Sequence, residues 1–285
     1  MIEQQAALYI VATPIGNLLD MSMRAVDVLK SVSLIAAEDT RHSAVLLQHF
    51  GITTKMVSYH DFASTRSAEK LLEKVRSGLS VALISDAGTP LISDPGYKLV
   101  NLARQEDLKV VPIPGACAIT AAISVAGLPS DKFIFEGFLP NKMAARQAQL
   151  RSVLLETRTL IFYESPHRII ASLEDFNTVF GGQRKLFIAR EISKKFETLT
   201  LKSLEECLKF VSADANQQRG EFVLILEGAD KDGVVDSKHN EALAMVGLLL
   251  EDLSMKRAVA VAAKITGAKK NKLYEEVLAR HKSSS

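Results

Sequence analysis

The sequence of 285 residues contains no tryptophan and only two cysteines, Cys117 and Cys207. Two cysteines this far apart fit neither a disulfide framework nor a zinc site, and no histidine pair has metal-ligand spacing. No apolar run approaches the length of a membrane span, and the first residues lack the pattern of a signal peptide. We therefore expect a cytoplasmic protein without a metal and without a membrane partner.

The chain also lacks the two common phosphate-binding motifs. Residues 13–18, T-P-I-G-N-L, follow the first expected strand without a G-x-G-x-x-G pattern, and no G-x-x-x-x-G-K-[ST] occurs. These absences disfavour a Rossmann dehydrogenase and a P-loop nucleotidase. Loops of small residues with few cations suit a ligand without phosphates, such as S-adenosylmethionine, better than a nucleoside triphosphate.

The small net charge of +2 hides an asymmetry along the chain. Residues 254–285 hold eight basic and two acidic residues, a net charge of +6, which leaves −4 for residues 1–253. A basic appendage on an acidic body indicates a polyanionic partner, although a solvated helical face that aids solubility has the same composition.

Apolar runs and helical patterns alternate through the first half, which predicts a largely parallel, doubly wound α/β sheet. Its strands are expected at residues 8–12, 34–37, 55–59, 80–85 and 109–113. Strands at 132–137, 159–163, 185–191, 196–201 and 221–227 are joined by shorter connections, which favours a mixed sheet. Residues 228–237 have the composition of a linker. We therefore expect α/β domains at 1–115 and 116–229 and a helical tail at 237–285.

The tail is similar to a helix-turn-helix. Helical segments are expected at 239–253, 256–266 and 269–280, and Gly267 separates the last two. Lys269, Lys270 and Lys272 open the final segment, where helix-turn-helix units contact nucleic acid. A helical hairpin that packs on the body is the alternative, and it leaves the lysines unexplained.

Four loops should gather at one edge of the first sheet, because ligands bind outside the carboxyl ends of strands in open α/β sheets. They are residues 13–18, 37–42, 86–95 and 112–118. Gly88 and Gly96 let the backbone approach a ligand closely. In the second loop, Glu38 and Arg41 could serve proton transfer or phosphate contact, while Asp39 or Thr40 could instead cap a helix.

Six segments in register resemble the bacterial ribosomal RNA methyltransferases of the tetrapyrrole methylase superfamily. The match runs from about residue 8 to residue 227, and Ser193 stands where threonine is expected, which keeps the hydroxyl. The segments are L-Y-I-V-A-T-P-I-G-N-L, A-A-E-D-T-R-H, S-D-A-G-T-P-L-I-S-D-P-G, P-I-P-G-A-C-A, F-Y-E-S-P-H-R and A-R-E-I-S-K.

The resemblance implies a class III methyltransferase with S-adenosylmethionine in a cleft between two α/β domains, and a homodimer. It implies methylation of the ribose 2′-hydroxyl of a cytidine in the decoding region of 16S rRNA, in the small ribosomal subunit. A precorrin-type tetrapyrrole methyltransferase would not need the basic tail. A non-catalytic RNA-binding protein would not need the loop at 86–95.

Site residues are assigned on this basis. Asp39 and Glu38 are candidate bases, and Lys194 is a candidate for stabilising the alkoxide. The expected cofactor contacts are Pro14, Gly16, Asp86, Ala87, Gly88, Thr89, Ile92, Ser93, Ala116, Thr120, Tyr163 and Glu164. The expected RNA contacts are Arg41, Lys142, Arg146, Arg168, Arg190, Lys256, Arg257, Lys269, Lys270 and Lys272.

Overall fold

Five short apolar segments form the first sheet. The computed structural model describes residues 6–60 and 65–283. Every strand pairing in this sheet is parallel, and the strand order is β3-β2-β4-β1-β5. The strands are β1 (Leu8–Val11), β2 (Leu34–Ala37), β3 (Met56–Ser58), β4 (Val81–Ile84) and β5 (Val110–Ile113). β2 and β4 are buried throughout, as expected for strands covered on both faces.

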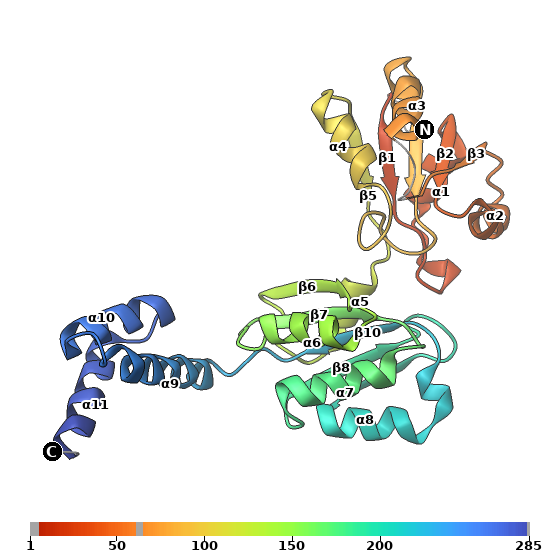
Figure 1. Ribbon diagram of the computed structural model, residues 1–285. Helices are drawn as coiled ribbons and strands as arrows, with labels where there is room; N and C mark the ends of the chain where they lie inside the picture. Colours follow the sequence, from red (N-terminus) through yellow and green to blue (C-terminus); the bar gives the residue numbers. More distant parts are fainter. Residues whose placement is uncertain (1–5, 61–64, 284–285) are drawn as a thin grey trace.

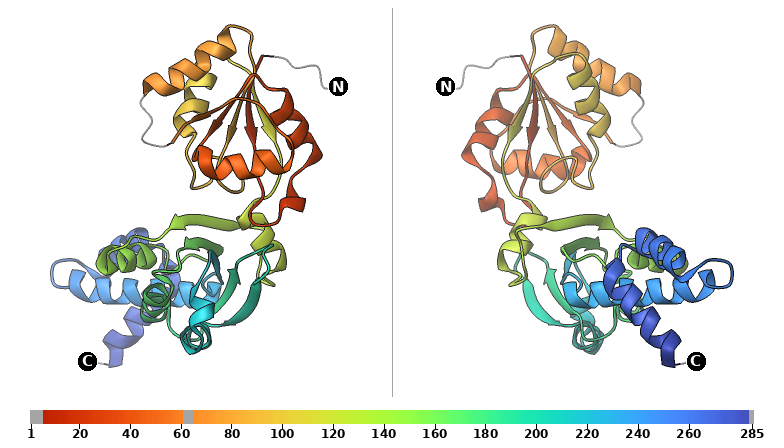
Figure 2. Two further views of the ribbon diagram at one scale, coloured as in Figure 1. Left: turned by 90° about the vertical axis from the view of Figure 1, so that its right-hand side faces the viewer. Right: turned by 90° about the vertical axis from the view of Figure 1, so that its left-hand side faces the viewer.

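Helices cover both faces of this sheet (Figure 2). The helices are α1 (Met23–Ser31), α2 (Thr40–His49), α3 (Thr65–Arg76) and α4 (Tyr97–Gln105), and a 3₁₀ turn spans Leu18–Asp20. α1 and α2 share one apolar core with the sheet, and α3 and α4 share the other. This doubly wound arrangement confirms the expected architecture of the first half. The carboxyl ends of the strands point toward the second sheet (Figure 2).

The second sheet is mixed, as the short connections predict. Its order is β6-β7-β10-β8-β9; β6 and β7 are parallel, and the other pairings are antiparallel. The strands are β6 (Phe133–Phe138), β7 (Thr159–Glu164), β8 (Lys185–Arg190), β9 (Thr198–Ser203) and β10 (Phe222–Leu226).

The two faces of the second sheet are covered unequally. The helices are α5 (Ala118–Val125), α6 (Met143–Ser152), α7 (Ile169–Phe180) and α8 (Leu204–Ala213), and a 3₁₀ turn spans Ala215–Gln218. α6, α7 and α8 pack on one face, whereas α5 shares the smaller core of the other face. The single short helix leaves part of that face open toward the first domain (Figure 1).

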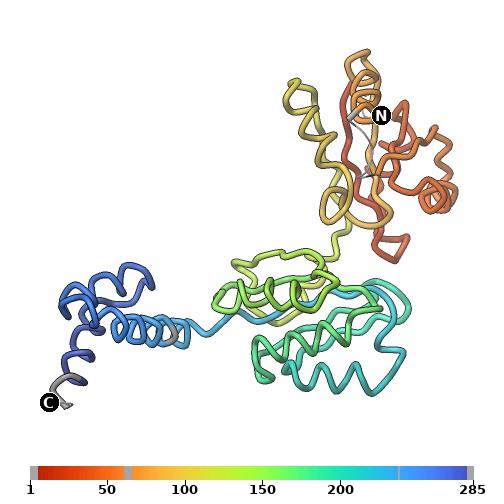
Figure 3. Tube along the Cα trace, viewed as in Figure 1, coloured from red at the N-terminus to blue at the C-terminus, as the bar shows by residue number. Residues whose placement is uncertain are grey.

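Three helices with their own apolar core form the tail: α9 (Lys231–Leu249), α10 (Met255–Thr266) and α11 (Lys270–Ser283). They form a separate cluster beyond the second sheet (Figure 1), and the chain enters them directly after β10 (Figure 3). Gly267 ends α10 in the left-handed conformation with φ 75°. The expected linker at 228–237 is wrong in extent, because Asp230 caps α9 and the helix begins at Lys231. None of the described helices is long and apolar enough to cross a bilayer.

Candidate active site

The four loops expected at one edge of the first sheet do meet there. Thr13 and Gly88 exchange backbone hydrogen bonds, with N–O distances of 2.9 and 3.1 Å. The Thr89 hydroxyl donates to the Ala116 carbonyl at 3.0 Å, which joins the third loop to the fourth. The backbone N–H of Asp39 donates to the Asp86 carboxylate at 3.0 Å, which attaches the second loop. A sheet-edge site assembled from four loops is therefore present.

A cavity of about 450 Å³ lies between these loops and the open face of the second sheet. This volume is typical of small-molecule sites, about 300–1,000 Å³. Five of its lining side chains are carboxylic acids, and none of the described lining residues is Lys, Arg or His. The acids are Glu38, Asp86, Asp94, Glu164 and Glu221. An acidic cavity of this kind attracts a cationic ligand and repels phosphate.

Eight of the twelve expected cofactor contacts line this cavity: Asp86, Ala87, Gly88, Thr89, Ile92, Ser93, Tyr163 and Glu164. Pro14, Gly16, Ala116 and Thr120 are not among the lining residues. Thr120 is exposed, and its hydroxyl donates to the Cys117 carbonyl at 3.0 Å within the first turn of α5. A Cβ at Gly16 would collide with the Lys194 side chain, so this glycine permits close approach of the two domains. These four residues are close in the chain to lining residues such as Ile15 and Cys117 but do not line the cavity themselves.

Sequence reasoning missed several lining residues of the second domain. Glu221 directly precedes β10, and Phe222 and Val223 begin it. Ala189 lies near the end of β8, and Ile192 lies in the loop after it. Their sequence signal is only that of ordinary buried strands. Their place at the cavity depends on β10 pairing between β7 and β8, which strand patterns cannot specify.

Backbone strain is concentrated beside the cavity. Leu91 and Ser93 in the first domain have φ of 75° and 63°, and Glu191 and Ser193 in the second have 51° and 64°. Non-glycine residues in this left-handed region cost roughly 1–3 kcal/mol each and persist where surrounding contacts hold them, often at functional sites. Ser193 is held by its hydroxyl, which donates to the Asp20 carboxylate at 2.9 Å across the two domains. A serine at the expected threonine position keeps this link.

Lys194 is not itself a lining residue, but it is held by two carboxylates, one of which, Glu221, lines the cavity. Its Nζ lies 2.8 Å from Glu191 Oε1 and 2.9 Å from Glu221 Oε2. Partial burial alone would lower the pKa of Lys194, but hydrogen bonds to Glu191 and Glu221 outweigh it and raise the pKa. A raised lysine pKa means that the ammonium persists at neutral pH. Lys194 is therefore suited to stabilise negative charge and unsuited to accept a proton.

Asp39 performs the alternative role that the sequence left open, that of a helix cap. Its carboxylate accepts the Arg41 backbone N–H at 2.8 Å and caps α2. The Arg41 guanidinium donates to the same carboxylate at 3.2 and 2.8 Å. These hydrogen bonds lower the pKa of Asp39 to about 2. A carboxylate held in this way is a weak base, and Asp39 does not line the cavity, so the geometry favours Glu38.

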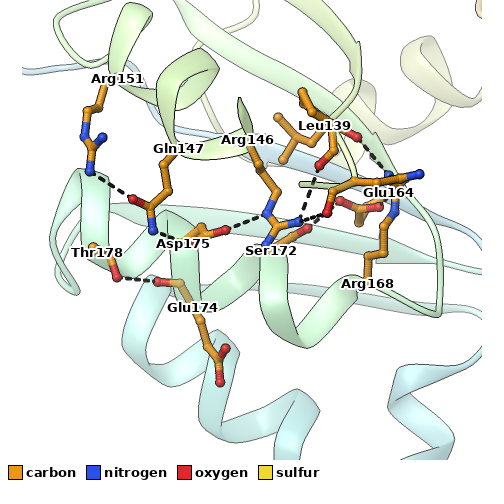
Figure 4. Close-up of polar contacts among 12 residues, drawn as sticks. Leu139, Arg146, Gln147, Arg151, Glu164, Arg168, Ser172, Glu174, Asp175 and Thr178 are labelled. Carbon is orange, nitrogen blue, oxygen red and sulfur yellow. Dashed lines mark hydrogen bonds and ion pairs between the residues drawn. The ribbon is translucent and has the colours of Figure 1, made fainter. Parts of the chain in front are cut away.

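Arg146 was expected to contact RNA, and the structure contradicts this. Its Nε donates to Asp175 Oδ2 at 2.6 Å, and the two side chains are only 5% and 6% exposed (Figure 4). The amide of Gln147 donates to the other Asp175 oxygen at 2.6 Å. Removing one partner of a buried ion pair typically costs about 3–5 kcal/mol, because the other charge stays buried. Arg146 therefore stabilises the α6–α7 contact.

Arg168 and Arg190 are also engaged within the protein. Arg168 pairs with buried Glu164 at 2.9 Å and donates to the Leu139 carbonyl at 2.9 Å (Figure 4). Arg190 is buried, and its guanidinium donates to the Phe196 carbonyl at 2.9 Å and to the Arg219 carbonyl at 3.1 Å. The burial of Arg190 contradicts its expected RNA contact, whereas the RNA contact of half-buried Arg168 stays a prediction. The remaining expected RNA contacts are exposed: Arg41, Lys142, Lys256, Arg257, Lys269, Lys270 and Lys272.

Comparison with known proteins decides the family. The family model for tetrapyrrole (corrin/porphyrin) methylases matches residues 7–208. The chain belongs to this methyltransferase family. The resemblance predicted from the six sequence segments is thereby confirmed. A second model, for the RsmI C-terminal HTH domain, matches residues 236–281, which cover α10 and most of α9 and α11.

The relatives of this methylase carry a more specific name. The chain is 52% identical over 277 residues to a protein of Pseudomonas aeruginosa named ribosomal RNA small subunit methyltransferase I, covering 97% of this chain and 98% of that one. It is 51% identical to a protein of the same name from Vibrio cholerae, covering 94% and 93%. A solved cobalt precorrin-4 methyltransferase shares the fold, with a TM-score of 0.56 at 12% identity over 78% of this chain and 95% of that one.

Proposed function

We propose that this methylase transfers the methyl group of S-adenosylmethionine to the ribose 2′-hydroxyl of a cytidine in the decoding region of 16S rRNA. The observation that carries the proposal is the near full-length identity of about half to relatives named as small-subunit rRNA methyltransferases. The acid-lined cavity and the separate basic tail support it independently. A precorrin-type substrate is disfavoured, because such a small molecule gives the tail no role.

The cavity residues fit S-adenosylmethionine. Its sulfonium and ammonium groups are cations, and the five lining carboxylates match them in sign. Gly88, Ala87 and Ala118 leave room beside the backbone, and Ile15, Ile92 and Val223 supply apolar surface. When bound, the sulfonium cofactor supplies an activated methyl group.

The residues of this chain then have two tasks. A ribose hydroxyl is a poor nucleophile until a base accepts its proton or a cation stabilises the developing alkoxide. Glu38 is the carboxylate of the cavity that we assign to accept the proton as the new carbon–oxygen bond forms. Lys194, held by Glu191 and Glu221, is the cation that we assign to the alkoxide oxygen. The cavity between the two domains would align donor and acceptor.

Incubation with labelled S-adenosylmethionine tests the proposed function directly. Small ribosomal subunits that lack the modification should take up one methyl group per particle, located by nuclease mapping at a cytidine 2′-oxygen. Free 16S rRNA and a precorrin are assayed in parallel. Label in the precorrin alone, or in no acceptor, would refute the proposal.

The tail is proposed to hold the RNA by charge. Replacing Lys269, Lys270 and Lys272 with glutamine should flatten the slope of log affinity against log salt by about 2–3 units, if each lysine meets a phosphate. A matched variant, Lys30, Lys70 and Lys74 to glutamine, removes the same charge from exposed helices of the first domain. Equal salt slopes for the two triple variants would show that the tail lysines do not contact RNA phosphates.

We also propose a cytoplasmic homodimer. Ribosomal RNA is found in the cytoplasm, and the open face of the second sheet has apolar surface that a second copy could cover. Leu199 and Leu201 of the end strand β9 are exposed beside Phe187 and Ala189 in the register of the sheet. Sedimentation should then give twice the 31.1 kDa of one chain, and a monomer at assay concentrations would exclude the dimer.

A further inference from the structure

An exposed aromatic ring stands at the cavity wall. Phe138, the last residue of β6, lines the cavity and yet is 52% exposed. Its ring lies 5.4 Å from the Tyr163 ring, and Tyr163 meets Phe135 edge-on at 4.9 Å. The Phe138 ring is therefore in contact with the Tyr163 ring, which is itself held by Phe135. Phe138 thus continues the apolar part of the cavity lining, which includes Ile92 and Val223, out to the protein surface.

An irregularity in the pairing of β6 determines on which face of the sheet the Phe138 ring lies. Phe135 and Phe138 are three residues apart, so a regular strand would place them on opposite faces. The pairing of β6 with β7 shifts between Phe135 and Gly137, and both rings consequently contact Tyr163. Gly137 has a φ of 69°, a conformation that favours glycine. Bulges next to active sites commonly re-aim a side chain in this way.

Arg168 holds the segment that follows Phe138 in place. Arg168 donates to the carbonyl of Leu139 at 2.9 Å (Figure 4). It also donates to the side chain of Asn141. The same guanidinium pairs with Glu164, which lines the cavity. Arg168 therefore positions the segment after Phe138. Lys142, which follows Asn141, is exposed at the surface.

The charge of the cavity selects which part of an RNA can enter. Five carboxylates line it, and although Glu164 and Glu221 among them each have a cationic partner, the cavity disfavours phosphates, for which exposed Lys142 is available outside. The cofactor accounts for much of a volume of about 450 Å³, which leaves the target nucleoside at the mouth. Aromatic faces in RNA-binding proteins stack on unpaired bases of single-stranded loops.

We propose that Phe138 is the stacking surface for the base of the nucleotide that is methylated. The inference rests on the proposed function, because it requires RNA as the acceptor. Stacking positions the nucleoside through its base while the ribose hydroxyl reaches the cofactor. Ile92, exposed on the first-domain side of the same cavity, offers a second apolar surface.

Leucine replacements test the role of the ring. Phe138→Leu keeps apolar volume and removes the aromatic face, and Phe133→Leu makes the same change at a ring on β6 that is 42% exposed and does not line the cavity. Phe138→Leu should lower kcat/KM for unmethylated small subunits by about 5- to 150-fold, the range of one lost base stack. Phe133→Leu should match the wild type, and the affinity for S-adenosylmethionine, measured by calorimetry, should stay within a few-fold in both variants.

Fluorescence gives a second measurement, because the chain contains no tryptophan. Phe138→Trp retains a stacking face and introduces a single indole at the site, and small subunits should quench it beyond any change that S-adenosylmethionine alone produces. Phe133→Trp is the control and should be unaffected by either. Equal kinetics of the two leucine variants would overturn the inference, as would a loss of cofactor affinity confined to Phe138→Leu. Failure of the wild-type protein to label RNA would instead refute the proposed function.

Discussion

Replacing Lys194 with methionine is expected to slow methyl transfer by about 100- to 1,000-fold, the effect of removing one group that stabilises a developing oxyanion. Methionine keeps much of the length of the side chain and removes its charge. The ammonium acts on a charge that develops only in the transition state, so affinity for the cofactor and for small subunits should change little. Single-turnover methylation with saturating cofactor measures the step directly.

Lys195 supplies the matched control for this experiment. It is the next residue, it is exposed, and its ammonium lies 5.6 Å from the centre of the Phe196 ring. Lys195→Met removes the same charge from the same loop and should leave turnover within about two-fold of the wild type. Similar turnover for both variants would show that Lys194 is an interdomain contact only, as its packing against Gly16 allows.

The pH dependence separates the cation from the base. Hydrogen bonds to Glu191 and Glu221 raise the pKa of Lys194, so its charge is present below that pKa and is lost only as the pH rises through it. Activity should therefore not decline between pH 7 and about 10, the ordinary lysine pKa, on account of this group. The rate of methylation should fall only on the acidic side of its pH profile, where the carboxylate base becomes protonated. Glu38→Gln should abolish this acidic decline.

The fold could be predicted from the sequence because local patterns and tertiary contacts agree. Continuous apolar runs such as residues 34–37 and 81–84 specify buried parallel strands, and both strands are observed there. The linker was misjudged because Asp230 and Gly233 have loop composition, whereas Asp230 accepts the Gly233 N–H and starts α9. Composition gives no sign of which polar residue caps a helix and which ends one.

The site was only partly predictable, for a different reason. Gly88 and Asp86 lie in a loop that is rich in glycine, proline and aspartate, and this composition after an apolar strand predicts a binding loop. Arg146 and Arg190 look like surface cations in sequence, and their burial depends on Asp175 and on the loop carbonyls that fold against them. Phe138 is one of several phenylalanines, and only the bulge before it and the contact with Tyr163 distinguish it. Charge partners and strand register are tertiary facts that a single sequence does not contain.

Replacing Gly88 with valine should weaken cofactor binding by about 5- to 150-fold, the equivalent of the roughly 1–3 kcal/mol that added atoms cost in a well-packed site. Gly88 lines the cavity with a φ of 76°, a conformation that β-branched residues adopt only under strain. A Cβ there would lie 3.2 Å from Ile15 Cγ2 and 3.7 Å from the Ala116 carbonyl oxygen. The substitution therefore presses on two loops of the cofactor site at once.

Gly51→Val separates this local effect from general destabilisation. Gly51 has a similar φ of 61° but has nothing within 4 Å of its Cβ position, and it follows α2 outside the cavity. Both variants should lose stability in urea unfolding, because both force a branched residue into the left-handed region. Only Gly88→Val should lose affinity for S-adenosylmethionine in calorimetry. Undiminished affinity in a folded Gly88→Val protein would mean that the cofactor binds elsewhere, since no ligand against this loop could ignore a displaced backbone.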